Sequence, residues 1–311
     1  MKHFDVAVNN IALHVTEIGE GEPVLFCHGF PDTARTWKRQ MEAVAAAGYR
    51  AIAPDMRGYG RSSAPEDAAL YTPFHTVGDL VGLLDALDLP DTVIVGHDWG
   101  AVVAFHAALM RPDRFKAVFC LSSAYTPRGD ESLLDHMRAA GLQERFYMFR
   151  QIDPKADQEW ADAARSIPGM IYWASGLPSE ETRWSPFDPA RGLNRQAPDG
   201  EPSFADPEYL AYNIAEFERT GFHGSLNYYR AVDPFFELSG AFKGAKIRQP
   251  SHFMIGKSDG LNEFRRLSFE TLRIGLPGLT GFIELDGVGH WPQHEAPDAV
   301  NGALIDFLGS L

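Results

Sequence analysis

The chain has little positive charge. Its 311 residues include 28 lysines and arginines against 42 aspartates and glutamates, which gives a formal net charge of −14 at pH 7. Nucleic acids and anionic membrane surfaces attract proteins through a positive field. We therefore expect neither nucleic acid nor a membrane as a partner.

Long apolar runs and a secretion signal are also missing. No stretch approaches the roughly 20 apolar residues that are needed to span a bilayer. The N-terminus has neither the charged region nor the apolar region of a signal peptide. These absences predict a cytoplasmic protein, and they leave open whether the chain forms a homo-oligomer.

Cysteine is scarce, because only Cys27 and Cys120 occur. Both lie inside apolar runs that predict buried strands, so we expect buried free thiols rather than a disulfide. The sequence shows no cluster of potential metal ligands. We expect neither a metal nor an organic cofactor.

The remaining composition is that of an ordinary globular protein, with 45% hydrophobic and 23% charged residues. The length is long for one domain and short for three. A single large core with an inserted segment fits this length as well as two linked domains do.

The first part of the chain alternates between strand and helix patterns. Residues 6–8 and 11–18 alternate in polarity around Asn9 and Asn10, which predicts a β-hairpin because asparagine tolerates positive φ. Short apolar runs then predict buried strands with helices between them. The strands are expected at residues 24–27, 49–53, 92–95 and 117–121, and the helices at residues 36–47, 76–87 and 100–109. This alternation is typical of a parallel sheet with helices on both faces.

The pattern changes between residues 125 and 235, where no buried-strand run occurs and helical patches are broken by proline and glycine. Residues 185–207 predict a long exposed loop, after which Asp206 and Pro207 can begin a helix that Gly221 can end. Strand patterns return at 251–255 and 281–285. We therefore predict an α/β core formed by residues 1–124 and 236–311, with residues 125–235 inserted as a helical cap.

Residues 92–101 carry the most informative pattern. An apolar strand ends in Gly-His-Asp-Trp-Gly at residues 96–100, and a helix pattern follows at once. A strand-to-helix turn this sharp needs glycine on both sides, and it lifts its central side chain above the sheet beside a helix N-terminus. That side chain is usually serine, but here it is Asp98. Because aspartate can also be a plain helix cap, the neighbouring motifs must decide its role.

A His-Gly pair at residues 28–29 follows the first buried strand. In enzymes with such a turn, the N–H after this pair and the N–H after the nucleophile stabilise an oxyanion. The donors here would be the backbone N–H groups of Phe30 and Trp99. The alternative is a plain glycine–proline turn.

Two further residues complete a predicted triad. Asp259 follows the strand at 251–255, where a carboxylate can hold a histidine in one tautomer. The other position for this acid, after the fourth buried strand, offers no carboxylate until Asp130. His290 lies in a glycine-flanked loop between the last strand and the last helix. The order nucleophile, acid, histidine is that of the α/β hydrolases, so Asp98, Asp259 and His290 are the predicted catalytic residues.

These motifs resemble those of a known family. HGFPD, GHDWGA, RPDRF, GKSD and GHW are similar to motifs of the epoxide hydrolases of the α/β-hydrolase superfamily, over nearly the whole chain. The resemblance implies an α/β-hydrolase core with a helical cap, a small apolar epoxide and water as substrates, and catalysis without a cofactor.

The family also places a tyrosine in each of two cap motifs. These resemble residues 146–151 and 221–230, although the chain is one residue shorter after Arg150 than the family pattern. The resemblance therefore implies Tyr147 and Tyr229 as donors to the epoxide oxygen. A phenol suits this role because its pKa near 10 keeps it protonated at neutral pH. Since adjacent helical residues point about 100° apart, only one of Tyr228 and Tyr229 can face the cleft.

The other histidines and tyrosines are expected to be structural. We interpret His28 and His97 as residues that pack or hydrogen-bond inside the protein, and we expect His294 to be exposed. Tyr209 should pack with its hydroxyl group in water.

The expected reaction begins when Asp98 attacks an epoxide carbon and forms a hydroxyalkyl ester. His290, oriented by Asp259, then activates the water that hydrolyses this ester to release a vicinal diol. Two alternatives stay open: a haloalkane dehalogenase that uses the same triad, and a ligand-binding protein on the same scaffold. A serine esterase is disfavoured because the turn at residues 96–100 has no serine.

Overall fold

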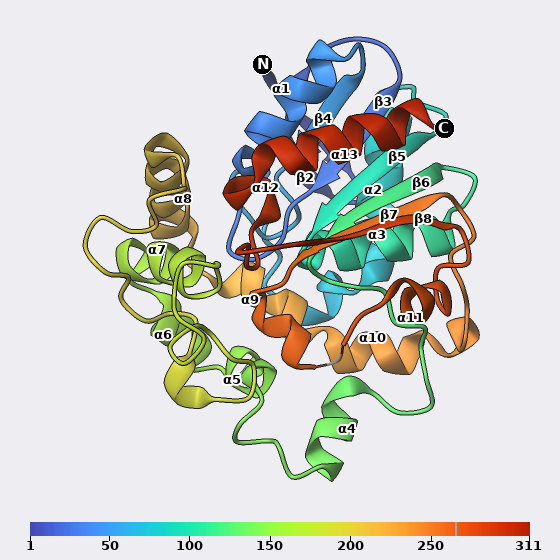
Figure 1. Cartoon of the computed structure of the whole chain (residues 1–311). Coiled ribbons are helices and arrows are strands. Elements are labelled where there is room, and N and C mark those ends of the chain that lie inside the picture. Colours follow the sequence, from blue (N-terminus) through green and yellow to red (C-terminus); the bar gives the residue numbers. More distant parts are fainter. Residues whose placement is uncertain (265) are drawn as a thin grey trace.

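The computed structural model describes residues 1–264 and 266–311, and within them it contains one eight-stranded sheet with helices on both faces (Figure 1). The strands are β1 (Lys2–Val8), β2 (Ile11–Ile18), β3 (Pro23–Cys27), β4 (Arg50–Pro54), β5 (Thr92–His97), β6 (Phe115–Leu121), β7 (Ser251–Gly256) and β8 (Leu279–Leu285). The helices are α1 (Lys38–Ala46), α2 (Pro73–Ala86), α3 (Trp99–Met110), α4 (Leu133–Ala139), α5 (Tyr147–Ile152), α6 (Ala156–Trp160), α7 (Ala163–Trp173), α8 (Pro207–Thr220), α9 (His223–Arg230), α10 (Val232–Leu238), α11 (Phe269–Arg273), α12 (Pro292–Glu295) and α13 (Pro297–Gly309).

The sheet order is β1-β2-β4-β3-β5-β6-β7-β8. The pairs β1–β2 and β2–β4 are antiparallel, and all later neighbours are parallel. Asn9 and Asn10 form the predicted hairpin turn with φ of 46° and 62°. The predicted strands and the alternation with helices are confirmed.

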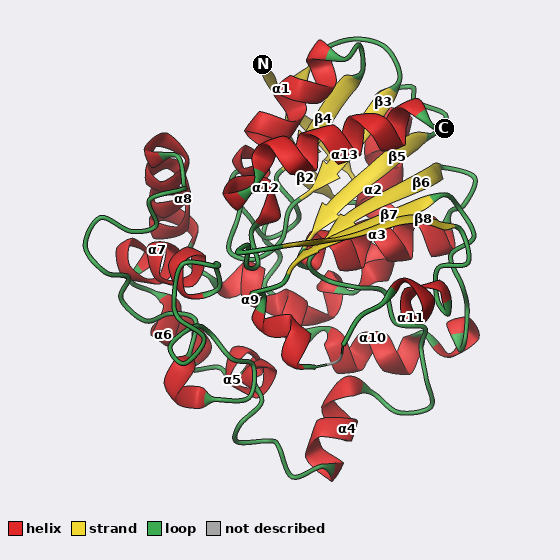
Figure 2. Cartoon of the chain, viewed as in Figure 1, coloured by secondary structure: helices red, strands yellow, loops and turns green. Residues whose placement is uncertain are grey.

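Helices cover both faces of the sheet (Figure 2), and alternate residues of the central strands pack in different cores. Val24 and Phe26 of β3 pack in the core that includes α1 and α13, whereas Leu25 and Cys27 pack in the core that includes α2 and α3. This period of two explains why the central strands are apolar at every position.

The segment between β6 and β7 contributes helices α4 to α10, and α5 to α8 form a group beside the sheet (Figure 1). Helix α10 extends to Leu238, beyond residue 235, where the sequence predicted the inserted segment to end. Helix α8 begins after Asp206, whose carboxylate accepts from the Glu208 N–H, and it ends at Gly221 with φ 67°. Both predicted ends of this helix are confirmed.

The prediction of an exposed loop at residues 185–207 is only partly right. The stretch has little regular structure, but Ser185, Leu193 and Ala197 are all at most 5% exposed. The loop packs against α7, because a Cβ atom at Gly169 would lie 2.0 Å from the Arg195 carbonyl oxygen. Although most residues of this loop are polar, some of its side chains point inward and are buried.

Helix α8 is attached to the core through Asp32. One carboxylate oxygen of Asp32 accepts hydrogen bonds from the Tyr209 hydroxyl and from the Asn213 amide, each at 3.0 Å. The expectation that the Tyr209 hydroxyl lies in water is wrong, because the hydroxyl is needed to solvate this buried carboxylate. Burial raises the pKa of Asp32 to about 7.

Cys27 and Cys120 are buried free thiols, as predicted. They lie on β3 and β6, on either side of β5, in register with Gly96. Among the helices of residues 1–264 and 266–311, none has both the length and the apolar character that crossing a membrane requires.

The junction between β5 and α3 leaves no room for side chains. A Cβ atom at Gly96 would lie 2.4 Å from the Gly100 carbonyl oxygen, and one at Gly100 would lie 2.0 Å from the Cys27 carbonyl oxygen. Because these contacts are with backbone atoms, no side-chain rotation can relieve them. Both glycines are therefore required by packing.

We expect Gly100→Ala to lower the free energy of unfolding by about 3 kcal/mol, because the added methyl group overpacks the junction. Gly302→Ala is the matched control, since Gly302 lies inside α13 with no atom within 4 Å of its Cβ position. That change should raise stability by about 0.5–1 kcal/mol. Urea unfolding followed by circular dichroism measures both, and equal stabilities of the two variants would contradict the packing argument.

Candidate active site

Asp98 occupies the turn between β5 and α3 with φ 52° and ψ −121°. L-residues rarely adopt this region, and such strain persists only where the surrounding structure enforces it. The strand–turn–helix geometry predicted for residues 96–100 is thus present. Asp98 occupies the N-cap position of α3, but its side chain does not cap the helix, because it accepts no hydrogen bond from the first turn.

Two backbone N–H groups lie beside the Asp98 side chain. The Phe30 N–H donates to Asp98 Oδ1 at 2.8 Å. A Cβ atom at Gly29 would lie 2.3 Å from that oxygen and 2.7 Å from the Trp99 nitrogen, so only glycine allows this approach. The two donors predicted from the sequence, Phe30 and Trp99, therefore lie next to the same carboxylate.

The carboxylates of Asp98 and Asp259 lie on opposite sides of the His290 ring. His290 Nδ1 is 2.8 Å from Asp259 Oδ2, and His290 Nε2 is 3.4 Å from Asp98 Oδ2. Asp259 Oδ1 accepts in addition from the Leu261 N–H at 2.9 Å. The structure thus brings together the three residues of the predicted triad, although they come from three separate loops.

The pairing of opposite charges has a larger effect on the pKa values of His290 and Asp98 than burial has. Burial alone lowers the pKa of His290, but the charges and hydrogen bonds of Asp259 and Asp98 outweigh it and raise that pKa to about 10. Burial alone raises the pKa of Asp98, and the hydrogen bond and charge of His290 outweigh it to hold that pKa below its usual value. At neutral pH the site therefore contains an imidazolium between two carboxylates.

The two predicted tyrosines face the site, and the neighbouring Tyr228 does not. Tyr147 and Tyr229 line a small cavity with Asp98 and His290, and their rings meet edge to face with centroids 6.2 Å apart. Tyr228 points elsewhere, because its hydroxyl donates to the Arg57 carbonyl oxygen at 3.0 Å. Only one of the two adjacent tyrosines faces the site, as the helical spacing requires.

Both of these phenols are harder to ionise than a free tyrosine. Burial is the largest cause, and the negative charge of Asp98 adds to it, so the pKa values of Tyr147 and Tyr229 lie well above 10. They remain protonated throughout the neutral range. Each can therefore donate a hydrogen bond toward the space above Asp98.

Glu295 was not anticipated from the sequence, and it shapes the loop of His290. Its Oε2 accepts from the Gly176 and Gly289 N–H groups at 2.8 and 2.9 Å, and its Oε1 accepts from the Trp291 N–H at 3.0 Å. The His290 N–H donates to the Ala174 carbonyl oxygen at 2.8 Å. The only sequence signal is an acidic residue one turn after the histidine loop.

Other buried groups support the same loop. His97 Nε2 and the Ser122 hydroxyl donate to the His290 carbonyl oxygen at 2.7 and 2.9 Å, and the Gln293 amide donates to His97 Nδ1 at 3.1 Å. His28 Nε2 accepts from the Met56 N–H at 2.9 Å. His28 and His97 are thus buried hydrogen-bonding residues, as interpreted from the sequence.

The expectation that His294 is exposed is wrong. It is 6% exposed, its Nε2 lies 2.8 Å from the Thr36 hydroxyl, and its ring packs against Tyr209 with centroids 4.4 Å apart. Helix α8 covers this position, and nothing in the local sequence around residue 294 indicates that cover.

A cavity of about 550 Å³ opens beside Asp98. Besides Asp98 it is lined mainly by apolar side chains, among them Trp99, Val102, Met148 and Leu267. In the part of the chain that the structure describes, no group of three or more His, Cys, Asp and Glu side chains could hold a metal ion. The Asp98 carboxylate thus lies at the edge of an apolar, ligand-sized space.

Comparison with known proteins agrees with this geometry. Residues 22–297 match the family model of the alpha/beta hydrolase fold. The chain is 63% identical over 308 residues to an epoxide hydrolase from Caballeronia sordidicola, with 99% of this chain and 94% of the relative covered. The chain belongs to the epoxide hydrolases of the α/β-hydrolase family.

Other epoxide hydrolases extend the comparison. Epoxide hydrolase A from Mycobacterium tuberculosis is 39% identical over 313 residues, which cover 98% of this chain and 97% of the relative. The crystal structure of epoxide hydrolase A from Mycobacterium thermoresistibile superposes with a TM-score of 0.91 at 38% identity, covering 99% of this chain and 98% of the other. An epoxide hydrolase from Vigna radiata gives 0.88 at 34% identity, covering 100% and 98%.

We expect the imidazole of His290 to titrate near pH 10, and Asp98→Ala to lower that pKa by about one unit or more, because one of its two anionic partners is removed. NMR spectra of histidine-labelled protein measure the titration. His97 is the internal control, since burial lowers its pKa to about 3 and it stays neutral in both proteins.

The same titration has a consequence for stability. The charged form of His290 stabilises the folded state fully below the unfolded pKa of about 6.5, and this contribution is lost as the pH rises through about 10. A His290 that titrates near 6.5 in both proteins would contradict the pairing.

Proposed function

We propose that the chain hydrolyses an epoxide to a vicinal diol through a covalent hydroxyalkyl ester on Asp98. One observation carries the proposal: the Asp98 carboxylate lies beside His290, 3.4 Å from its Nε2, and shares a cavity with two protonated phenols. A nucleophile, a base and proton donors thus surround one small space. Residues 125–235 would serve as the cap that carries the two phenols.

In the first step, an oxygen of the Asp98 carboxylate attacks a ring carbon and the bond from that carbon to the epoxide oxygen breaks. Tyr147 and Tyr229 hold the epoxide oxygen, and one of them gives it a proton as negative charge develops. The proton of the His290 imidazolium then restores the phenol. The product of this step is a neutral ester on Asp98.

Formation of the ester changes His290 into a base. The charge of Asp98, which helps to raise the pKa of His290, no longer exists in the ester. The neutral imidazole, oriented by Asp259, takes a proton from water, and the hydroxide attacks the Asp98 carbonyl carbon. The N–H groups of Phe30 and Trp99 stabilise the resulting oxyanion, at about 3 kcal/mol per donor.

Collapse of this intermediate breaks the acyl–oxygen bond. The departing diol oxygen takes the proton from His290, and the acid formed on Asp98 returns its proton to the imidazole. The resting pair of carboxylate and imidazolium is restored, and one oxygen of Asp98 now comes from water.

The path of oxygen tests the proposal directly. In a single turnover of styrene oxide in ¹⁸O-labelled water, we expect the label in the Asp98 peptide and unlabelled oxygen in the diol. Mass spectrometry of the peptide and of the product measures both. Label in the diol with none in Asp98 would exclude the ester, and faster release of halide from bromoalkanes than of diol from epoxides would indicate a dehalogenase.

The phenols are tested by removing only their hydroxyl groups. Tyr147→Phe combined with Tyr229→Phe should lower kcat/KM for styrene oxide by about 100-fold or more, the usual size of a general-acid contribution. Tyr228→Phe is the matched control, because its hydroxyl faces Arg57 and not the site. That variant should keep its activity while losing about 1 kcal/mol of stability. Unchanged turnover in the double variant would refute the donor role.

A further inference from the structure

Asp98 lines two cavities of very different size. On the side of Trp99 the cavity measures about 550 Å³ and reaches the surface at Leu133, which is 39% exposed. A second cavity of about 220 Å³ shares Trp99, Val102, Leu133 and Met148 with it. This side has room for a large apolar group.

On the side of His290 the free space shrinks to about 10 Å³. That is room for about one water molecule. The residues around this space include Asp98, His290, Tyr147, Tyr229, Trp184 and Leu193. The water that the proposed mechanism needs fits here. An epoxide ring held between Asp98 and the two phenols leaves no room on this side for a further group.

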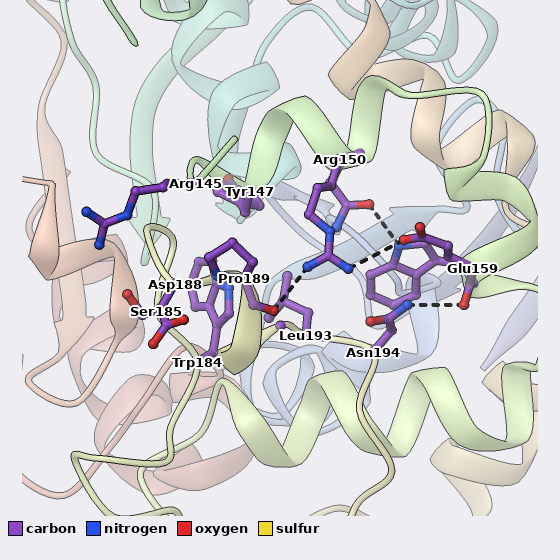
Figure 3. A pocket seen from close by; sticks show the side chains of 13 residues that line it. Arg145, Tyr147, Arg150, Glu159, Trp184, Ser185, Asp188, Pro189, Leu193 and Asn194 are labelled. Atoms are coloured by element: carbon purple, nitrogen blue, oxygen red, sulfur yellow. Dashed lines mark hydrogen bonds and ion pairs between the residues drawn. The ribbon is translucent and has the colours of Figure 1, made fainter. Parts of the chain in front are cut away.

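A separate pocket of about 30 Å³ lies beyond this space, and Tyr147, Trp184 and Leu193 line both (Figure 3). These side chains therefore form the wall between them. Charged side chains line part of the outer pocket, and Figure 3 shows Arg150 paired there with Glu159. Arg150 Nη2 lies 3.6 Å from Glu159 Oε2. An apolar group that passed the wall would displace water from these charged side chains, which costs free energy.

Contacts of neighbouring residues hold Leu193 and Trp184 of this wall in place. The Asn194 amide donates to the Glu159 carbonyl oxygen at 3.1 Å, which fixes the residue after Leu193. The Arg195 guanidinium lies 3.8 Å from the centre of the Trp173 ring. Trp184 packs on Gly260 so closely that a Cβ atom there would lie 2.7 Å from the indole. Leu193 and Trp184 are therefore not free to swing aside.

The substrate must fit a site that has a large cavity at one end and almost no free space at the other. Its ring oxygen faces the two phenols and one ring carbon faces Asp98, so the groups on the two ring carbons lie on opposite sides of the nucleophile. We propose that Leu193 restricts the enzyme to epoxides with a bulky group on only one ring carbon, that is, to terminal epoxides whose apolar group occupies the large cavity. This inference rests on the proposed function.

The unmodified enzyme gives the first test. Styrene oxide, trans-1-phenylpropylene oxide and trans-stilbene oxide differ only in the group on the second ring carbon. We expect kcat/KM to fall along this series, by about 100-fold or more between the first and the last, because even one surplus carbon in a closed pocket costs about 10-fold or more. Values within about threefold of each other would overturn the proposal.

The second test removes the wall. Leu193→Ala should raise the ratio of kcat/KM for trans-stilbene oxide over styrene oxide by about 10-fold or more, and Leu193→Val by less. Leu133→Ala is the matched control, because it enlarges the side that is already open and should leave the ratio within about twofold. An unchanged ratio in Leu193→Ala would refute the role of Leu193.

The ratio of two substrates in one preparation is independent of how much of a variant is folded. Failure of the inference can also be told from failure of the proposed function. If no epoxide of the series is converted to a diol, the proposed function is wrong. If all are converted equally, only the restriction by Leu193 is wrong.

Discussion

The close approach of three backbone segments around Asp98 is the constraint on which the site depends. The residue has a positive φ, a conformation that costs about 1–3 kcal/mol for an L-residue. Gly29, Gly96 and Gly100 allow the neighbouring segments to come near enough to hold it there. The same contacts place the Phe30 N–H against the carboxylate. Strain at Asp98 and the donor beside it are therefore two results of one packing arrangement.

The electrostatics of the site build on this placement. One buried imidazole lies between two carboxylates, with Nδ1 facing Asp259 and Nε2 facing Asp98, so the negative charge of both stabilises the protonated ring. Any chemistry that neutralises one carboxylate must loosen this proton. The order of the proposed steps is thus set by charge, because His290 becomes a base only after Asp98 has reacted. The order of the two proposed steps therefore requires no conformational change.

Residues that lie next to a local pattern could be predicted from the sequence. Asp98, Asp259 and His290 each follow a strand and have glycine nearby, and the strands themselves carry a clear apolar signal. Parallel strands bring such loops to one edge of the sheet. The adjacent pair of tyrosines could also be resolved, since helical spacing allows only one of them to face the site.

Residues whose surroundings come from distant segments could not be predicted. Leu193 lies in a stretch whose polar composition suggests solvent, yet it is buried because this stretch packs on α7. His294 is covered by α8, and Tyr209 solvates a carboxylate that lies far away in the sequence. Glu295 acts on Gly176, a backbone group of the inserted segment. Such contacts depend on how distant segments pack, and the sequence around each residue does not identify its partner.

The hydrogen bonds that the Gly176 N–H donates to Glu295 and the His290 N–H donates to Ala174 have a consequence for recombination between relatives. They join the loop of His290, the proposed base, to the residues that directly follow α7 in the inserted segment. That segment is therefore not an interchangeable module. A chimaera that takes α7 from one parent and the loop of His290 from another has to preserve this seam, and a crossover that separates them would misplace the imidazole even if both halves fold.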